Sequence, residues 1–399
     1  MEKKSRSLNK KYQYSKNFCA AMWGHVYFSN DGEVNYCCLA DKSKSSIGNV
    51  NQNSLEEIYN NKKFKEVRKN MLEDKSLPSA CDICIDREKS NLGSLRKRFN
   101  DNFFDLISKN IDLDTGEIFD FLPKSIDVRL SNYCNLSCAM CSPLFSSRWK
   151  DYEKVTSKKE YKGLISIPFD NLFFKNLEKY ITDIKFIHFA GGEPILMPEH
   201  WYILDRLSNK NIKLMYTTNA TTTVFKNRSV FEEWKKFKEV LITLSIDSVE
   251  EYYEYIRYGT KWEIVKENIF KYKNSGLNYK IHPTISILNI LSFPKLHEWL
   301  IENKIVIDDE NTWEFLDINP LYNPSYYSIQ NLPFELKQVT EEILLSHAEQ
   351  YRNKSGFENL VNFMYQDQID NYDLFLNITN NYDKLRNLSF FELYPEFKK

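Results

Sequence analysis

Through the middle of the chain, short apolar runs alternate with longer stretches in which apolar residues recur every three or four positions. The short runs predict buried β-strands, and the longer stretches predict amphipathic helices. The predicted strands are 125–130, 184–189, 212–217, 240–246, 280–288 and 313–318, and the predicted helices are 171–182, 199–209, 229–238, 249–274 and 293–303. Strands that alternate with helices form a parallel sheet, open or curled into a partial barrel, so an α/β fold is expected.

The residues before the first of these strands predict a smaller module. Positions 26–34 read as a β-hairpin whose turn is an Asp-Gly pair, which favours tight hairpin turns. The stretch 54–70 has helical periodicity, and Ser54 and Glu57 occupy the capping-box positions at its start. Further helices are predicted at 86–109, 335–352, 357–366 and 380–391. The predicted organisation is a small domain at 1–90, a helical connector at 91–124, the sheet domain at 125–320 and a mainly helical extension at 321–399.

Composition narrows the class of protein. Glycine and proline are 11 and 12 of the 399 residues and aromatic residues are 15%, which excludes collagen-like and disordered chains. Lys plus Arg number 54 against 55 for Asp plus Glu, so no global attraction to nucleic acid or to an anionic membrane is indicated. The densest basic run, 96–98, is predicted to be a solvated helix face. Neither a membrane-spanning run nor an apolar signal segment is present, so a cytoplasmic location is expected.

The cysteines carry the chemical information. The chain has eight of them, in one set of Cys19, Cys37, Cys38, Cys81 and Cys84 and a second set of Cys134, Cys138 and Cys141. The second set is a C-x3-C-x2-C run, whose three thiolates are suited to three irons of a cubane cluster. The fourth iron then has an open position, which is typical of metal sites that bind a substrate or cofactor. A zinc loop completed by a distant ligand is the alternative for this run.

Unusual residues also follow the other predicted strands. A Gly-Gly-Glu-Pro segment at 191–194 follows the second strand, and Asn219, Asp247, Asn289 and Asn319 follow the next four. In parallel α/β folds the chemistry lies at the carboxyl ends of the strands. We therefore predict that these residues and the cysteine run form one site.

At this point the chain resembles the radical S-adenosylmethionine (SAM) enzymes. The resemblance covers 125–320 and rests on C-x3-C-x2-C, on Gly-Gly-Glu-Pro and on the Ser-Ile-Asp segment at 245–247. It implies a partial (β/α)6 TIM-like barrel of the radical SAM type. One departure is Met140, because the position before the last cysteine is commonly aromatic in the family.

The resemblance also assigns ligands and contacts. Cys134, Cys138 and Cys141 would be the catalytic residues that hold a [4Fe–4S] cluster. SAM would chelate the unique iron of this cluster. Gly191, Gly192 and Glu193 would contact the methionine amino group, Ser245 and Asp247 would lie near the ribose, and Arg257 would pair with the SAM carboxylate. Asn219 and Asn289 are matched more loosely to the cofactor site.

The first cysteine set resembles the auxiliary-cluster modules called SPASM and Twitch. Its spacing is C-x12-G-x4-C, followed by a C-x2-C pair. The resemblance implies that Cys19, Cys37, Cys81 and Cys84 hold a second [4Fe–4S] cluster, with Cys38 as the alternative to Cys37. A four-cysteine structural zinc is the competing interpretation. The auxiliary module usually follows the barrel in the family, whereas here it precedes it.

The implied activity is one-electron chemistry. Reductive cleavage of SAM would give a 5′-deoxyadenosyl radical that abstracts hydrogen from a substrate, and we hypothesise that the auxiliary cluster relays the electron. The implied partners are SAM, an electron donor such as flavodoxin or ferredoxin, and an unidentified peptide or small-molecule substrate. The alternatives are a non-catalytic Fe–S or zinc scaffold, and a radical SAM enzyme that modifies nucleic acid.

Overall fold

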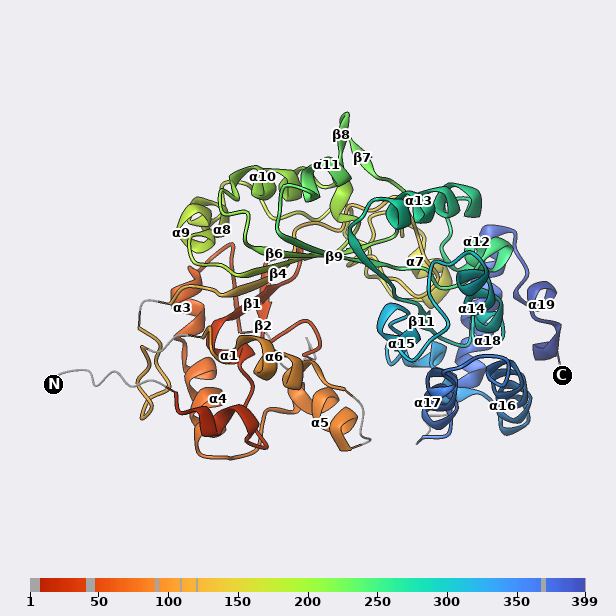
Figure 1. The fold of residues 1–399 in the computed structure, drawn as a ribbon, viewed down its shortest axis with the longest axis horizontal. Helices are drawn as coiled ribbons and strands as arrows, with labels where there is room; N and C mark the ends of the chain where they lie inside the picture. The colour runs from red at the N-terminus through yellow and green to blue at the C-terminus, as the bar shows by residue number, and fades with distance from the viewer. Residues whose placement is uncertain are drawn as a thin grey trace. The chain divides into compact units, whose positions relative to one another are not determined.

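The computed structural model describes residues 8–40, 47–89, 93–107, 110–119, 121–366 and 371–398 (Figure 1). The chain divides into two compact units. The first contains 1–131, 165–215 and 237–239, and the second contains 132–164, 216–236 and 240–399. The predicted segment boundaries at 90, 124 and 320 stay a prediction.

The first unit is built on a sheet in which the N-terminal hairpin joins the predicted barrel strands. Its strands are β1 (His25–Phe28), β2 (Glu33–Asn35), β3 (Gly48–Asn49), β4 (Ser125–Arg129) and β5 (Phe186–Ala190). The pairs β1/β2 and β2/β3 are antiparallel, whereas β1/β4 and β4/β5 are parallel. The predicted hairpin is confirmed, and Gly32 supplies the positive φ of 85° in its turn. The N-terminal module is thus continuous with the sheet through β1 and β4.

Helices cover both faces of this sheet. The helices of this unit are η1 (Lys10–Tyr14), α1 (Ala21–Gly24), α3 (Leu55–Tyr59), α4 (Lys62–Leu72), η2 (Ser79–Cys81), α5 (Asp82–Lys89), α6 (Leu95–Phe103), α8 (Leu172–Lys175), α9 (Leu177–Ile181), η3 (Pro194–Leu196) and α10 (Pro198–Arg206). Phe189 of β5 packs on His200 of α10, with ring centroids 4.8 Å apart. On the opposite face, His25 of β1 packs on Phe99 of α6 at 4.4 Å.

Two helices predicted in this unit are interrupted. The capping box of Ser54 and Glu57 is present, but the helix ends at Tyr59, and Asn61 caps α4 by accepting a hydrogen bond from the backbone N–H of Phe64. The helix predicted at 86–109 is divided between α5 and α6, and Ser94 caps α6. Residues 90–92, 108 and 109 of that prediction lie outside the described residues. Side-chain caps start these short helices, which apolar periodicity alone does not detect.

The second unit contains the remaining strands. They are β7 (Val224–Phe225), β8 (Arg228–Ser229), β9 (Glu239–Leu244), β10 (Asn278–Ile281), β11 (Thr284–Ile285) and β12 (Asn319–Pro320), while β6 (Lys213–Thr218) begins in the first unit and ends in the second. The pairs β9/β10 and β11/β12 are parallel. The strand predicted at 280–288 is interrupted at Pro283, which has no N–H to donate to a ladder.

Helices are the main regular elements of this unit, and those towards the C-terminus confirm the predicted helical extension. They are α7 (Tyr152–Thr156), α11 (Val230–Trp234), α12 (Glu250–Ile256), α13 (Trp262–Asn274), α14 (Phe293–Glu302), α15 (Thr312–Phe315), η4 (Ser325–Tyr327), η5 (Ile329–Asn331), α16 (Phe334–Ala348), α17 (Ser355–Met364), α18 (Tyr372–Arg386), α19 (Phe390–Leu393) and η6 (Pro395–Lys398). The helix predicted at 380–391 begins earlier, at Tyr372, and ends before Asn387, whose φ of 53° is left-handed. The α/β fold with parallel strands is confirmed.

The strand predicted at 313–318 is wrong. Residues Thr312–Phe315 form the helical turn α15, Leu316 makes a single parallel bridge to Ile281, and the strand β12 begins only at Asn319. The Trp313 indole donates a hydrogen bond to the Asn353 carbonyl at 3.1 Å, and its ring packs on Phe357 at 5.4 Å. These tertiary contacts outweigh the strand preference of the aromatic residues. Among the described residues, no helix is long and apolar enough to cross a membrane.

Candidate active site

The loop that carries Cys134, Cys138 and Cys141 follows β4 and belongs to the second unit. All three cysteines are free thiols and partly exposed. The loop is fixed by backbone hydrogen bonds to the end of α12, from Ser137 N–H to the Tyr258 carbonyl at 2.9 Å and from Ala139 N–H to the Ile256 carbonyl at 2.8 Å. The backbone between the cysteines is therefore held by regular structure elsewhere in the unit.

Gly259 explains why the predicted helix 249–274 is divided into α12 and α13. Its φ is +117°, and a Cβ atom at this position would lie 3.2 Å from the carbonyl oxygen of Asn135 in the cysteine loop. Glycine permits both the backbone conformation and the close approach. The break in the helix thus allows the cysteine loop to pack on this segment.

A buried ion pair lies beside the middle cysteine. Arg257 Nε is 2.7 Å from Asp247 Oδ2, and the Asp247 side chain is fully buried. Burial alone would lower the pKa of Arg257, but the Asp247 carboxylate raises it above its usual range. Burial raises the pKa of the Cys138 thiol, and the nearby Arg257 guanidinium opposes that rise. The structure thus brings together three of the predicted site residues, Cys138, Asp247 and Arg257.

Asn289 completes the polar surroundings of Asp247. The Asn289 side-chain amide donates hydrogen bonds to the Asp247 carbonyl at 2.8 Å and to the Thr284 carbonyl at 3.0 Å. Asp247 Oδ1 in turn accepts a hydrogen bond from the Thr284 N–H at 2.8 Å. Asn289 is fully buried, so in this structure it orders the loops after β9 and β10.

Replacing Asp247 by alanine should destabilise the protein strongly. The substitution leaves the buried Arg257 guanidinium without its partner, and breaking a buried pair on one side costs about 3–5 kcal/mol. Chemical denaturation of the metal-free chain measures the effect. Glu263→Ala, which removes an exposed i,i+3 pair with Lys266, is the control and should cost less than about 1 kcal/mol. Equal effects of the two substitutions would contradict the assignment.

Two further predicted residues lie close to the loop or to the strand ends. The Asn219 side-chain amide donates to Asn135 Oδ1 at 3.0 Å and lies 3.8 Å from the sulfur of Cys134. The backbone N–H of Ser245 donates to the Thr218 carbonyl at 2.9 Å, and Ser245 is partly exposed. The Asn219 side chain is thus in contact with Cys134, whereas Ser245 forms a backbone hydrogen bond to the end of β6.

The Gly-Gly-Glu segment follows β5 in the first unit. Gly191 has a φ of +121°, and a Cβ atom there would lie 3.2 Å from the Ser131 carbonyl oxygen. The Gly192 N–H donates to the same oxygen at 3.1 Å. Glu193 is fully buried, and its carboxylate accepts a hydrogen bond from the Ile195 N–H at 3.3 Å. The lack of a side chain at Gly191 therefore permits tight packing of this segment against the end of β4, and the Gly192 N–H fixes it there.

The four predicted auxiliary cysteines line one cavity in the first unit. They are Cys19 before α1, Cys37 after β2, Cys81 at the end of η2 and Cys84 on α5. Cys38 is not among the residues that line this cavity, and burial together with the nearby Asp127 carboxylate raises the pKa of its thiol. Of the two adjacent cysteines, Cys37 thus lines the cavity and Cys38 does not.

The chemistry of this donor set fits a metal group. Burial and the neighbouring cysteines raise the pKa of the Cys81 thiol to about 12 and that of Cys37 well above its usual range, and a bound metal lowers the pKa of a thiol that coordinates it. Among the described residues, no three Cys, His, Asp or Glu side chains converge as the ligands of a single ion do. Soft thiolates that surround a cavity suit an iron–sulfur cluster.

The N-terminus of α6 faces this cavity. Burial raises the pKa of the Cys84 thiol, while hydrogen bonds from the backbone N–H groups of Arg96 and Leu95 and the charge of Arg96 oppose the rise. Helix N-termini stabilise thiolates through these N–H groups and the helix dipole. The first turn of α6 is therefore part of the electrostatic environment of the cavity.

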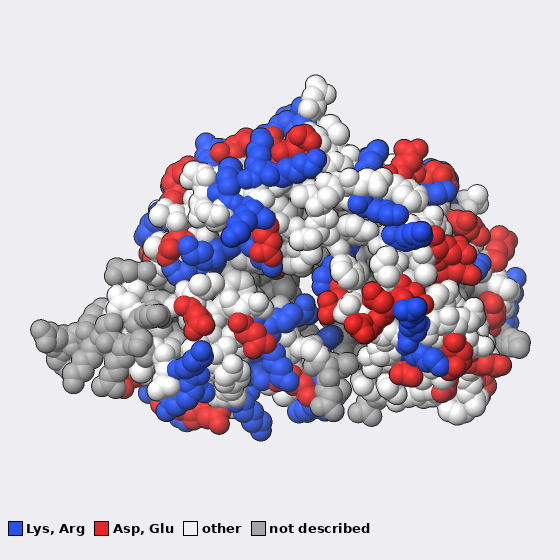
Figure 2. Space-filling view, viewed as in Figure 1, with Lys and Arg blue, Asp and Glu red and all other residues white. Residues whose placement is uncertain are grey.

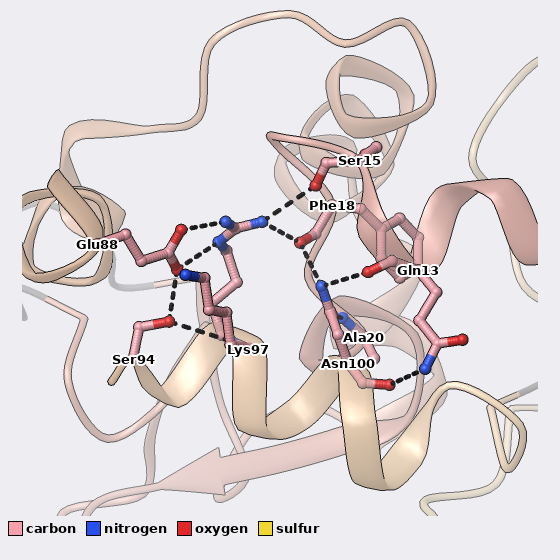
Figure 3. A network of polar contacts seen from close by, with 9 residues as sticks. Gln13, Ser15, Phe18, Ala20, Glu88, Ser94, Lys97 and Asn100 are labelled. Carbon is pink, nitrogen blue, oxygen red and sulfur yellow. Dashed lines mark hydrogen bonds and ion pairs between the residues drawn. The ribbon is translucent and has the colours of Figure 1, made fainter. Parts of the chain in front are cut away.

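Arg96 also fixes the backbone around the cavity, as a member of the polar network of Glu88, Phe18, Ala20 and Asn100 drawn in Figure 3. Its guanidinium forms a buried ion pair with Glu88 on α5 and donates to the Phe18 carbonyl at 2.8 Å. The Asn100 side chain donates to the same carbonyl at 3.0 Å and accepts from the Ala20 N–H at 2.8 Å. The network thus joins α5 and α6 to the segment that carries Cys19. The prediction of a solvated basic run is wrong for Arg96, which is only 7% exposed.

A charged row on the strands of the first unit was not predicted. Asp127 on β4 is paired in register with His188 on β5, and its carboxylate lies 3.2 Å from Arg129 and 3.3 Å from His188. Although burial alone would raise the pKa of Asp127, the Arg129 guanidinium holds it well below its usual range. The alternation of polar and apolar residues in Ser-Ile-Asp-Val-Arg was the available signal. The backbone of Arg129 packs closely against Gly191, because a Cβ atom added at Gly191 would lie 3.4 Å from the Cα of Arg129.

The structure thus combines an α/β fold with two separate groups of cysteines, one of which lines a cavity. Residues 128–300 match the radical SAM superfamily, and residues 19–85 match the SPASM iron–sulfur cluster-binding domain. The chain therefore contains a radical SAM domain preceded by a SPASM-type domain. The predicted resemblance to both families is confirmed, including the unusual order of the two domains.

The solved structures to which the chain is similar include anSMEcpe with bound AdoMet and Streptococcus suis SuiB bound to S-adenosylmethionine. The anSMEcpe chain is 19% identical over 57% of this chain and 59% of its own, with a TM-score of 0.39. The SuiB chain is 18% identical over 57% of this chain and 48% of its own, with a TM-score of 0.37. This chain thus spans about three-fifths of the first and half of the second. No curated protein matches the chain.

Proposed function

We propose that the chain is a radical SAM enzyme with two [4Fe–4S] clusters. The observation that carries the proposal is the loop of Cys134, Cys138 and Cys141, which the backbone of 256–258 fixes and beside which Arg257 and Asp247 form a buried ion pair. In this proposal the loop holds the cluster that binds SAM. When bound, the cluster and SAM supply a 5′-deoxyadenosyl radical that abstracts a hydrogen atom from the substrate.

The residues around the loop would orient the cofactor. Arg257 would provide a fixed positive charge for the SAM carboxylate, because the Asp247 carboxylate holds its guanidinium in place through Nε. The remaining predicted contacts are Gly191, Gly192, Glu193, Asn219, Ser245 and Asn289. Glycines permit close approach of the backbone to a ligand, and a carboxylate suits an ammonium partner.

The auxiliary cluster is proposed to bind Cys19, Cys37, Cys81 and Cys84. Four cysteine ligands leave no open iron, which favours electron transfer over substrate binding at this cluster. The electron donor to the enzyme would be a flavodoxin or ferredoxin. The donor set and its cavity support this assignment.

The substrate is proposed to be a peptide or a small molecule. A nucleic-acid substrate needs a basic surface, whereas Lys and Arg are interspersed with Asp and Glu over the face shown in Figure 2. Lysines of the chain are also paired with carboxylates, as Lys236 is with Glu233 and Lys354 with Glu349. The net charge of −1 also favours an uncharged or mixed-charge partner.

Anaerobic reconstitution tests the proposal. We expect about eight irons per chain from two cubanes, and an electron paramagnetic resonance (EPR) spectrum in which SAM changes the signal of only one reduced cluster. SAM binds the open iron of that cluster alone, which is the physical reason for the selective change. About two zinc ions per chain and no response to SAM would favour a structural scaffold instead.

Serine substitutions at Cys37 and at the adjacent Cys38 should have different effects on the iron content of the reconstituted chain. Cys37→Ser removes a thiol that lines the cavity, so the iron content should fall by about four per chain. Cys38→Ser is the matched control, since Cys38 does not line the cavity, and should retain the wild-type content. Iron and sulfide analysis after reconstitution measures both. The reverse result would make Cys38 the ligand.

A further inference from the structure

The last turn of α18 reaches the cysteine loop of the second unit. Arg386 Nη2 donates a hydrogen bond to the hydroxyl of Ser137 at 2.8 Å. Ser137 directly precedes Cys138 and is only 4% exposed. A residue close to the C-terminal end of the chain is thus in direct contact with the segment between two predicted cluster ligands.

Three aromatic rings surround the Arg386 guanidinium. Its central carbon lies 4.0 Å from the ring centroid of Tyr258, 5.0 Å from Trp149 and 5.7 Å from Tyr382. Two of these residues also bind the cysteine loop, because the Trp149 indole donates to the Cys138 carbonyl at 2.9 Å and the Tyr258 carbonyl accepts from Ser137. The guanidinium therefore packs between the same groups that hold the loop.

The positive charge of Arg386 has no acidic partner among the described residues. Its Nε is buried without a hydrogen-bond partner. The acid nearest in sequence, Asp383, is engaged elsewhere, since its carboxylate accepts hydrogen bonds from the Tyr255 hydroxyl at 2.7 Å and the Phe390 N–H at 2.8 Å. The aromatic faces compensate part of the charge, but a net positive charge remains beside the loop.

We propose that Arg386 is a positioning residue for the SAM-binding cluster, which it serves by fixing the loop at Ser137 and by placing an uncompensated positive charge beside an anionic cluster. The inference rests on the proposed function. Three thiolates give the cluster a negative charge that grows on reduction, and hydrogen bonds and charges around a cluster set its potential. A nearby cation favours the reduced form and so raises the midpoint potential.

Two substitutions at Arg386 separate charge from geometry. Arg386→Met removes the charge and the hydrogen bond, whereas Arg386→Lys keeps the charge but lacks the planar fork that stacks between aromatic rings. Lys384→Met is the matched control, because it removes a positive charge from an exposed position on the same helix. Far-UV circular dichroism and thermal unfolding establish that each variant folds.

The readouts are iron per chain and the midpoint potential of the cluster signal that responds to SAM. For Arg386→Met we expect a more negative potential and partial loss of iron, and for Arg386→Lys a potential near the wild-type value with a similar loss of iron. Lys384→Met should match wild type in both readouts. The inference would be overturned if Arg386→Met kept both the iron content and the midpoint potential of the wild type. If Arg386→Met does not fold, a wild-type iron content in Arg386→Lys would overturn it. A wild-type chain that binds no cluster would instead overturn the proposed function and this inference with it.

Discussion

Replacing Cys138 by serine is expected to abolish 5′-deoxyadenosine formation and to remove about half of the iron, that is, one of two cubanes. Cys138 is the middle ligand of the predicted set, and its backbone carbonyl is fixed by Trp149. Its thiol lies close enough to Arg257 for the guanidinium to lower the thiol pKa against the effect of burial. A serine hydroxyl remains protonated at neutral pH and does not replace a thiolate on iron. Chromatography of the reaction mixture measures the nucleoside.

Cys38→Ser is the appropriate control for this substitution. It makes the same chemical change at a free cysteine that lies outside the cysteine-lined cavity. The control should keep both its iron and its 5′-deoxyadenosine formation. A Cys138 variant that forms 5′-deoxyadenosine at the wild-type rate would show that the second cysteine set does not hold the catalytic cluster.

The double substitution Cys81→Ser and Cys84→Ser should separate SAM cleavage from product formation. Both thiols line the auxiliary cavity, so the variant should lose about four irons. The SAM-binding loop keeps its own contacts to 256–258, so 5′-deoxyadenosine should still form. If the auxiliary cluster accepts the electron after hydrogen abstraction, no oxidised product should accumulate from the substrate that the wild-type chain converts.

Mass spectrometry of the nucleoside and the substrate-derived product in parallel checks this second prediction. The matched control is Cys38→Ser, which should form both. Product formation at the wild-type level by the double variant would exclude an electron-relay role for the auxiliary cluster. Loss of 5′-deoxyadenosine as well would indicate that the auxiliary module is needed to fold the SAM-binding site.

Local chemistry made part of the structure predictable. The spacing of the first cysteine set, through its resemblance to the auxiliary-cluster modules, singled out Cys19, Cys37, Cys81 and Cys84, and the same four cysteines line the cavity. The hairpin turn and the capping box at Ser54 were predictable because each depends on residues only a few positions apart. The parallel strands β4, β5 and β9 begin and end within a few residues of their predicted limits.

Long-range contacts explain what was not predictable. The break between α12 and α13 depends on the approach of Asn135 to Gly259, which are far apart in sequence. The helical turn at Trp313 depends on its contacts with Asn353 and Phe357. Local periodicity contains no information on such partners, so it gave a continuous helix and a strand instead.

Charged groups in the interior show the same limit. A basic run on a helix usually faces solvent, but Arg96 forms an ion pair with Glu88 and donates a hydrogen bond to the Phe18 carbonyl within the fold. Asp127 pairs with Arg129 on its own strand and with His188 on the neighbouring strand. Pairing makes burial of such groups tolerable, and the pairing partner becomes known only from the three-dimensional structure.

The measurement that tests the central claim most directly is the assay of SAM cleavage by the reconstituted chain. Under anaerobic conditions, dithionite and SAM should yield 5′-deoxyadenosine and methionine in equal amounts, and omission of dithionite should stop the reaction. The reaction requires one electron from the cluster for each SAM, which is why it depends on the reductant. A chain that holds its clusters and leaves SAM intact in the presence of dithionite would contradict the account.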